Sequence, residues 1–233
     1  MSLTPPVRHR NRKARILLVE DHPIVRQGLA QLLGQTPDLE VRAFAEDTVS
    51  ALAAIKEQYP DLAIVDISLK SDDGLDLVKD LRARKIRLPV LILSMHQESV
   101  YAQRALRAGA QGYIMKGEPT PSLLTAIRKV LSGGLYFSED VTSAVLRLQA
   151  GGEPAALSPL ELLTDKELQV FRLIGQGRAT REIAESLNRS VKTIETHREN
   201  IKIKLGIKNS PQLVRAAVEW SSDATRPAAK PES

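Results

Sequence analysis

Hydrophobic residues between positions 16 and 132 follow two alternating patterns. Short runs that are almost wholly apolar, as expected of strands buried on both faces, occupy residues 16–19, 62–65, 90–93 and 112–115, and a weaker run lies near 41–44. Segments with helical spacing follow these runs at residues 23–33, 48–58, from about 74, 98–108 and 119–131. Successive strand–helix units with right-handed crossovers predict a doubly wound (βα)5 α/β domain, in which helices cover both faces of a parallel five-stranded sheet.

The first two predicted helices are amphipathic, so their apolar residues should face the sheet. These residues are Ile24, Leu29, Leu32 and Leu33 in the segment 23–33, and Val49, Leu52, Ala53 and Ile55 in the segment 48–58. We expect burial of these side chains against the strands to hold each helix in place, because tertiary packing supplies most of the stability of a short helix.

The pattern changes after residue 134. Glycine and proline interrupt the chain between 151 and 159, which marks a linker, and only helical periodicity remains beyond 160. Thr164 and Glu167 form a predicted capping box, Thr180 and Ser190 are predicted N-caps, and a last helix runs from Ser210 to about 220. We therefore predict a basic disordered tail at 1–14, the α/β domain at 15–134, a linker at 135–159, a small all-α four-helix domain at 160–220 and a disordered tail at 221–233.

Composition narrows the class of protein only a little. The 233 residues are 42% hydrophobic and include no cysteine, so disulfides and thiolate metal sites are excluded. No apolar run is long enough to cross a bilayer and the N-terminus is too polar for a signal peptide, so we expect a cytoplasmic protein. The net charge of +5 is matched by the five Lys and Arg residues of positions 1–15, which contain no acid, so global charge says little about a nucleic-acid partner.

Polar side chains stand at the carboxyl ends of the four strongly apolar strands. Glu20 and Asp21 follow the first strand, and Asp66, Ser94 and Lys116 follow the next three. Ligands of open α/β sheets bind at this edge, and three carboxylates can hold Mg²⁺ through few protein ligands plus water beside a phosphoryl group. Asp66 would attack that group as a nucleophile, Lys116 would pair with one of its oxygens, and Ser94 would donate a hydrogen bond to another.

Each of these residues also has a plainer interpretation. A single Asp after a strand is usually a cap or loop residue, an acidic pair in a loop is usually solvated, and so is a lone Lys. Their joint occurrence at the correct strand ends is what favours a chemical site over these alternatives.

The stretch from about residue 15 to 132 resembles the receiver domain of two-component response regulators, which has a flavodoxin-like fold. Residues 16–29 (ILLVEDHPIVRQGL) look like the NarL/FixJ subfamily in particular. Asp66 followed by Gly74 and Leu75 matches the phosphoacceptor loop, and the strings SMH at 94–96 and GYIMK at 112–116 match the two switch strands.

The resemblance implies a phosphorylation switch. A sensor histidine kinase would donate a phosphoryl group to Asp66, and the hydroxyl of Ser94 and the aromatic ring of Tyr113 would move in response. Lys116 would contact the phosphoryl group. The implied ligands of Mg²⁺ are Glu20, Asp21, Asp66 and the backbone carbonyl of Ser68.

Several loop residues bear on the chemistry. Receivers usually carry proline where this chain has Lys70, and many also do where it has Gly117. Aspartyl-phosphate phosphatases are the enzyme alternative, but they usually carry a second acid at the position of Ser68, so we expect the chain to catalyse only its own phosphorylation and slow dephosphorylation. Ser68 and His96 either flank the route of the hydrolytic water and tune the lifetime of the phosphoryl group, or are loop surface. His22 is expected to make a local loop contact.

Two predicted helices at 180–187 and 190–205, joined by residues 188–189 alone, have helix-turn-helix spacing. The alternative without DNA binding is an amphipathic helical hairpin with a solvated charged face. The apolar face of the second helix would consist of Val191, Ile194, Ile201 and Leu205. Candidate base-reading residues are Lys192, Glu195, Thr196 and Glu199. Candidate phosphate contacts are Thr180, Arg181, Thr193, Arg198 and Lys202, while His197 either packs or touches phosphate.

Residues 163–174 (LTDKELQVFRLI), 181–184 (REIA), 190–201 (SVKTIETHRENI) and 204–206 (KLG) resemble the LuxR-type DNA-binding domain. This resemblance implies double-stranded DNA as a partner and a homodimer formed through the last helix. The predicted function is that of a response regulator transcription factor in which phosphorylation of Asp66 controls sequence-specific DNA binding. The alternative is a phosphorylation-independent DNA-binding regulator whose receiver serves only as a protein-interaction module.

Overall fold

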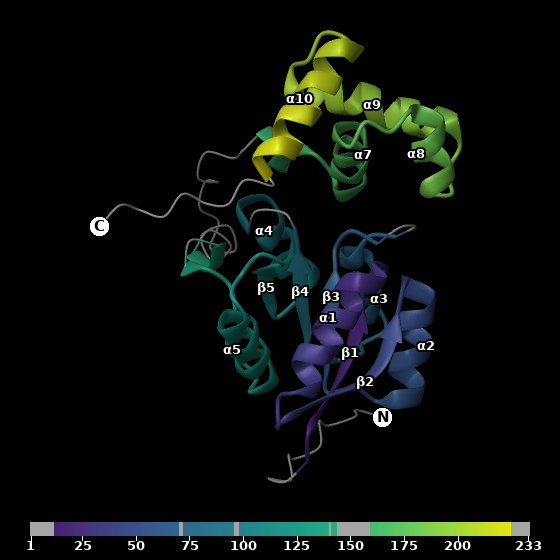
Figure 1. The fold of residues 1–233 in the computed structure, drawn as a ribbon. Helices are drawn as coiled ribbons and strands as arrows, with labels where there is room; N and C mark the ends of the chain where they lie inside the picture. Colours follow the sequence, from purple (N-terminus) through teal and green to yellow (C-terminus); the bar gives the residue numbers. More distant parts are fainter. Residues whose placement is uncertain (1–11, 70–71, 96–97, 140, 144–158, 225–233) are drawn as a thin grey trace.

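A parallel five-stranded sheet forms the centre of the N-terminal domain, as the apolar runs predict (Figure 1). The computed structural model describes residues 12–69, 72–95, 98–139, 141–143 and 159–224. Its strand order is β2-β1-β3-β4-β5, so the chain reverses direction across the sheet after β2 and the ends of β1 and β3 are neighbours. The strands are β1 (Ala14–Val19), β2 (Leu39–Ala45), β3 (Leu62–Asp66), β4 (Val90–Ser94) and β5 (Gly112–Met115).

Helices cover both faces of this sheet, which confirms the doubly wound architecture (Figure 1). Alternate residues of β1 show the two layers, because successive side chains of a strand point to opposite faces. Ile16 and Leu18 belong to the apolar cluster beneath α1 and α5, whereas Leu17 and Val19 belong to the cluster beneath the other three helices. The helices are α1 (Pro23–Gly34), α2 (Thr48–Gln58), α3 (Gly74–Ala83), α4 (Glu98–Ala108) and α5 (Thr120–Leu131).

The amphipathic pattern misplaces three of the eight residues of the first two helices that were expected to face the sheet, while Leu29, Leu32 and Leu52 pack against the core as expected. Leu33 and Ile55 are buried, but Ile24 is 86% exposed, Val49 is 77% exposed and Ala53 is also exposed. Ile24 and Val49 are each the second residue of their helix. The first turns begin at the carboxyl edge of the sheet, where no strand lies beneath them, so helical spacing alone overestimates the buried face.

The C-terminal part is wholly helical, as predicted. The described elements are a short 3₁₀ turn η1 (Pro159–Leu162) and the helices α7 (Asp165–Gly175), α8 (Thr180–Ser186), α9 (Val191–Leu205) and α10 (Ser210–Ala224). The predicted capping box is confirmed, since the Thr164 hydroxyl accepts from the Glu167 amide and the Glu167 carboxylate accepts from the Thr164 amide. Ser190 likewise caps α9, accepting a 3.1 Å hydrogen bond from the Thr193 amide.

Two predictions at helix ends are wrong. Thr180 is the first helical residue of α8 rather than its N-cap, which is Ala179, and the carboxylate of Glu182 accepts a 2.7 Å hydrogen bond from the Ala179 amide. The last helix does not end near residue 220 but continues to Ala224, so residues 221–224 are helical and do not belong to a disordered tail. The polar composition of the C-terminal segment gives no signal of this extra turn.

After residue 134 the described chain runs along the β5 edge of the sheet. Tyr136 forms a parallel bridge with Gly112, and its backbone exchanges hydrogen bonds of 2.8 and 2.9 Å with Gln111 and Tyr113. The N-terminal end of α7 and the turn η1 lie close to α3 and α4 (Figure 1). Within the described residues, every helix is too short or too polar to cross a membrane.

Candidate functional site

Five side chains from four strand ends meet at the carboxyl edge of the sheet. Glu20 and Asp21 follow β1, Asp66 ends β3, Ser94 ends β4 and Lys116 follows β5. The three carboxylates are each 2% exposed and Ser94 is fully buried, while the side chain of Lys116 is 9% exposed. The strand order brings them together because β1, β3 and β4 are neighbours whose ends share one edge.

Lys116 bridges two of the carboxylates. Its Nζ lies 2.6 Å from Oε2 of Glu20 and 2.8 Å from Oδ2 of Asp66. Burial alone would lower the pKa of Lys116, but the charges of Asp66 and Glu20 and the hydrogen bonds that both accept raise its pKa above the ordinary value. The ammonium is therefore charged at neutral pH and directed at the oxygen of Asp66.

The remaining carboxylate oxygens fit a divalent cation. Both oxygens of Asp21 and Oδ1 of Asp66 are buried, and no hydrogen bond reaches them from the described residues. Ligand atoms of Glu20, Asp21, His22 and Asp66 all lie within 4.8 Å of one another. Buried anionic oxygens without donors carry a large desolvation cost, which a cation offsets, and an oxygen-rich donor set suits Mg²⁺. Nothing in the structure tests the predicted backbone carbonyl of Ser68, which stays a prediction.

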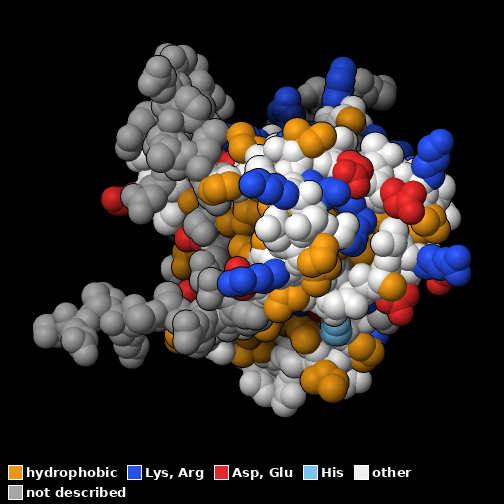
Figure 2. Space-filling view, turned by 90° about the horizontal axis from the view of Figure 1, so that it is seen from above, with side chains coloured by type: hydrophobic (Ala, Val, Ile, Leu, Met, Phe, Trp, Pro, Cys, Tyr) orange, Lys and Arg blue, Asp and Glu red, His pale blue; other side chains and the backbone are white. Residues whose placement is uncertain are grey.

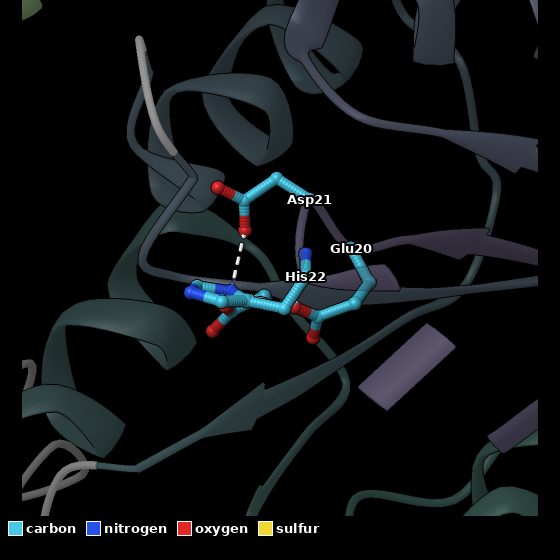
Figure 3. A group of neighbouring side chains, drawn as sticks. Glu20, Asp21 and His22 are labelled. Carbon is cyan, nitrogen blue, oxygen red and sulfur yellow. Dashed lines mark hydrogen bonds and ion pairs between the residues drawn. The ribbon is translucent and has the colours of Figure 1, made fainter. Parts of the chain in front are cut away.

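His22 lies against this cluster and makes the local loop contact that was predicted for it. Its Nδ1 is 2.9 Å from Oδ1 of Asp21 and 3.1 Å from Oε1 of Glu20, and the ring stands between the two carboxylates in Figure 3. The side chain is 61% exposed, so the ring covers the solvent side of the acidic group. Its position directly after Asp21 was the one signal in the sequence.

Ser94 and Tyr113, the two predicted switch residues, contact each other. The ring of Tyr113 is buried at 2% exposure, and its hydroxyl forms a hydrogen bond with the side chain of Ser94. Burial is the main cause that raises the pKa of Tyr113, and the Ser94 hydrogen bond offsets only part of it. A displacement of the Ser94 hydroxyl would therefore act through one hydrogen bond on Tyr113 and on the face formed by β5 and α4.

The loop after Asp66 returns tightly to its own start. The amide of Gly74 donates a 3.0 Å hydrogen bond to the carbonyl of Ile67, and a Cβ at position 74 would lie 2.1 Å from the carbonyl oxygen of Asp66. Asp73 caps α3 by accepting a 2.9 Å hydrogen bond from the Leu75 amide. Glycine is thus required at 74 by close approach of backbone, which is the physical reason for its place after the acceptor. Lys70 and His96 lie outside the described residues.

The predicted DNA-contacting residues divide by exposure. Arg181 and the candidate base-reading residues Lys192, Glu195, Thr196 and Glu199 are exposed. The half-buried ones are Thr180, Thr193, His197, Arg198 and Lys202. From above, Lys and Arg side chains are interspersed with acidic and apolar ones over the C-terminal helices (Figure 2). Of the predicted apolar face, Ile194 and Ile201 are fully buried and Leu205 partly so, but Val191 is 39% exposed.

One side of α9 faces the N-terminal domain. A cavity of about 330 Å³ is bordered by Thr193 and His197 on α9 and by Asp72 and Asp76 at the start of α3. In the described part of the chain no hydrogen bond reaches Nδ1 of His197, which is buried. Part of the predicted nucleic-acid face therefore looks onto the receiver, where Asp76 is paired with Lys166 of the DNA-binding domain.

Both domains match known families. Residues 16–128 match the response regulator receiver domain, and residues 161–217 match the luxR family of bacterial regulatory proteins. The oxygen regulatory protein NreC of Staphylococcus aureus is 35% identical over 210 residues, which cover 88% of this chain and 97% of NreC.

The chain belongs to the NarL/FixJ family of response regulators.

Solved response regulators share the fold of this one. RcsB of Salmonella enterica serovar Typhimurium, bound to the promoter rprA in the presence of the phosphomimetic BeF3−, matches with a TM-score of 0.65 and 26% identity over 88% of this chain and 98% of that chain. A two-component response regulator of the LuxR family from Aurantimonas sp. is 34% identical, with a TM-score of 0.53 over 59% of this chain and 99% of that chain. This response regulator thus consists of a receiver and a LuxR-type DNA-binding domain.

Proposed function

We propose that this response regulator accepts a phosphoryl group on Asp66 from a sensor histidine kinase and thereby controls the binding of its helix-turn-helix to double-stranded DNA. The observation that carries the proposal is the buried cluster at the strand ends. One oxygen of Asp66 is held 2.8 Å from the Lys116 ammonium, and the other has no hydrogen-bond donor within the described chain.

The chain's own residues account for the transfer. Asp66 is the nucleophile: one of its carboxylate oxygens forms the new bond to phosphorus while the P–N bond of the kinase's phosphohistidine breaks. Lys116 lies within hydrogen-bond reach of Asp66 and would pair with one phosphoryl oxygen, and the Ser94 hydroxyl would donate to another. That donation competes with the hydrogen bond between Ser94 and Tyr113, so phosphorylation would alter the packing of the tyrosine.

Glu20, Asp21 and Asp66 would hold Mg²⁺ through carboxylate oxygens, with the Ser68 carbonyl as a further ligand. When bound, Mg²⁺ supplies the positive charge that offsets repulsion between a phosphoryl group and three carboxylates. Phosphorylation and slow dephosphorylation of Asp66 are then the only catalysis, because position 68 offers a hydroxyl rather than a second acid.

The output is DNA binding by a homodimer in the cytoplasm. Lys192, Glu195, Thr196 and Glu199 are the proposed base-reading residues, with phosphate contacts from the residues named for that role above. Val214 and Val218, one turn apart on α10, are 40% and 41% exposed and would form part of the dimer contact. The RcsB relatives support this assembly, since one structure contains two RcsB dimers bound to two parallel DNAs.

The test of the acceptor is phosphorylation by acetyl phosphate in the presence of Mg²⁺, followed by mass spectrometry of the intact chain. We expect one phosphoryl group on the wild-type protein, its loss in Asp66→Asn and in buffer with EDTA, and its retention in Asp80→Asn, which removes a surface carboxylate of α3 instead. Incorporation that persists in Asp66→Asn would show that the acceptor is another residue.

One observation favours the phosphorylation-independent alternative: the four proposed base-reading residues are exposed in the structure without a phosphoryl group. That alternative predicts equal DNA affinity with and without a phosphodonor. Against it stands the other side of α9, where Thr193 and His197 border a cavity shared with Asp72 and Asp76 of the receiver, so the receiver lies where DNA phosphates would approach them.

A further inference from the structure

An arginine of the DNA-binding domain lies at the phosphoacceptor loop of the receiver. Arg172 belongs to α7, yet its Nη1 donates a hydrogen bond to Oγ of Ser68, the second residue after Asp66. The arginine is 3% exposed, and its Nε is buried without a hydrogen-bond partner among the described residues. A charged side chain is thus buried in the interface, and the hydrogen bond that the described residues show for it goes to this loop.

The loop that Arg172 contacts is a single structural unit with the acceptor. Ser68 forms an antiparallel bridge with Asp73, and the next residue, Gly74, lies against the backbone of Asp66. The carboxylate of Asp73 is 4% exposed; burial raises its pKa to about 6, and the charge of Arg172 acts in the opposite direction. Arg172 and Asp73 therefore form a buried pair of opposite charges on either side of the domain boundary.

Charged contacts around this pair hold the helix in place. The carboxylate of Asp165 at the start of α7 forms ion pairs with Lys79 and, at 2.6 Å, with Nη1 of Arg104. Nζ of Lys166 lies 2.5 Å from the carboxylate of Asp76. Nη2 of Arg104 also donates to the carbonyls of residues 160 and 163, at 2.9 and 2.7 Å. At the other end of the interface, the rings of Tyr101 and Phe171 stand 6.4 and 5.7 Å from that of Trp220. Docking of α7 on the receiver thus fixes the position of Arg172.

Two effects of Arg172 on phosphoryl chemistry have opposite signs. As a free cation near Asp66 it would attract a phosphoryl anion, which speeds acceptance and slows hydrolysis. As a residue that fixes Ser68, it would hold a side chain beside the line of attack. The hydrogen bond of Arg172 goes to Ser68 rather than to Asp66, and the charge of Asp73 opposes that of Arg172, so the contact favours the second effect.

Because phosphoryl transfer is in line, a side chain fixed beside the line of attack affects phosphorylation and hydrolysis in the same direction. When Asp66 attacks acetyl phosphate, acetate departs on the side of the phosphorus opposite the Asp66 oxygen. When water hydrolyses the aspartyl phosphate, it enters on that same side, forms a bond to phosphorus and breaks the bond to Asp66, which releases inorganic phosphate. A side chain fixed beside this line hinders both reactions.

We propose that Arg172 is a positioning residue of the receiver site, supplied by the DNA-binding domain, which fixes the Ser68 hydroxyl beside the line of attack and slows both phosphorylation and hydrolysis at Asp66. The proposal rests on the proposed function, because it presupposes acceptance at Asp66. It assigns the first helix of the DNA-binding domain a part in the lifetime of the phosphorylated state.

The test is a double-mutant cycle on the full chain with acetyl phosphate and Mg²⁺. Both rates, for incorporation and for loss of the phosphoryl group, are measured in wild type, Arg172→Ala, Ser68→Ala and the double variant. Arg172→Ala should speed both rates by about fivefold, the size expected for one lost hydrogen bond. In the Ser68→Ala background, the arginine substitution should have no further effect. Arg178→Ala, which removes an exposed arginine just after α7, is the control and should leave both rates unchanged.

Each other outcome overturns the proposal. Slower incorporation with faster hydrolysis in Arg172→Ala would mean that the arginine acts as an electrostatic anchor. Unchanged rates, or additive effects of the two substitutions, would mean that the contact with Ser68 is merely structural. Ser68→Ala leaves α7 intact, so it remains informative if Arg172→Ala fails to fold. If the wild-type protein takes up no phosphoryl group at all, the proposed function fails instead.

Discussion

Replacing Asp21 by asparagine tests whether the buried carboxylates form a cation site. Asp21, Glu20 and Asp66 are each 2% exposed, and Lys116 contacts the last two. Neither oxygen of Asp21 receives a hydrogen bond from the part of the chain that the structure describes. The Asp21→Asn variant keeps the shape of the side chain and removes its charge, so the metal-free protein should become more stable.

The magnitude follows from the separation of the charges. The ligand atoms of the cluster lie within 4.8 Å of one another. Two like charges at that distance repel by about 3.5 kcal/mol at an effective dielectric constant of about 20. Asp21 meets this repulsion from Glu20 and from Asp66, while Lys116 offsets part of it. We therefore expect Asp21→Asn to raise the free energy of unfolding of the metal-free protein by about 1–3 kcal/mol.

Urea denaturation at pH 8, in EDTA and in Mg²⁺, measures both the repulsion among the carboxylates and the stabilisation by the cation. Mg²⁺ at about a hundred times its Kd should stabilise the wild-type protein by about 2.7 kcal/mol, and most of that gain should be lost in Asp21→Asn. Glu57→Gln, which removes an exposed carboxylate of α2, is the matched control and should behave like wild type. Lower stability of Asp21→Asn than of wild type in EDTA, or equal stabilisation of both proteins by Mg²⁺, would show that the carboxylates do not form a cation site.

Three further predictions concern the loop, pH and DNA. Gly74→Ala would place a Cβ 2.1 Å from the Asp66 carbonyl oxygen, so thermal denaturation should show a loss of about 2 kcal/mol or more; unchanged stability would contradict this. Burial raises the pKa of Asp73 to about 6, so its contribution to stability is full below about pH 4 and lost as the pH rises through 6. Asp73→Asn should therefore flatten the pH dependence of the unfolding free energy between pH 4 and 7 by up to about 3 kcal/mol, and a slope like that of wild type would count against it. Lys202→Ala should weaken binding to all DNA sequences alike and reduce the salt slope by about 1, which an unaltered slope would disprove.

The strand-end site was predictable because it depends on local pattern and one topological rule. Each of the residues Glu20, Asp66, Ser94 and Lys116 directly follows an apolar run, and parallel strands bring their carboxyl ends to one edge. Likewise, the capping box at Thr164 involves residues three apart, so the sequence contains the whole interaction.

Contacts between distant segments were not predictable. Arg172 and Ser68 are 104 positions apart, and α7 reads as an ordinary amphipathic helix in which an arginine belongs to the solvated face. The pairing of Tyr136 with Gly112 depends on the unfilled edge of β5 and has no turn signal. Exposure of Ile24 depends on where the sheet ends beneath α1, which periodicity does not encode.

The central claim is that a phosphoryl group on Asp66 changes the affinity of the helix-turn-helix for DNA. The most direct measurement is the Kd for a DNA duplex selected from a random pool, determined by fluorescence anisotropy with and without BeF3− and Mg²⁺ at fixed salt, for wild type and Asp66→Asn. We expect BeF3− to lower the Kd of the wild-type protein about tenfold or more, equivalent to roughly 1.4 kcal/mol of coupling, and to leave that of Asp66→Asn unchanged. Equal affinity of the wild-type protein with and without BeF3− would contradict it.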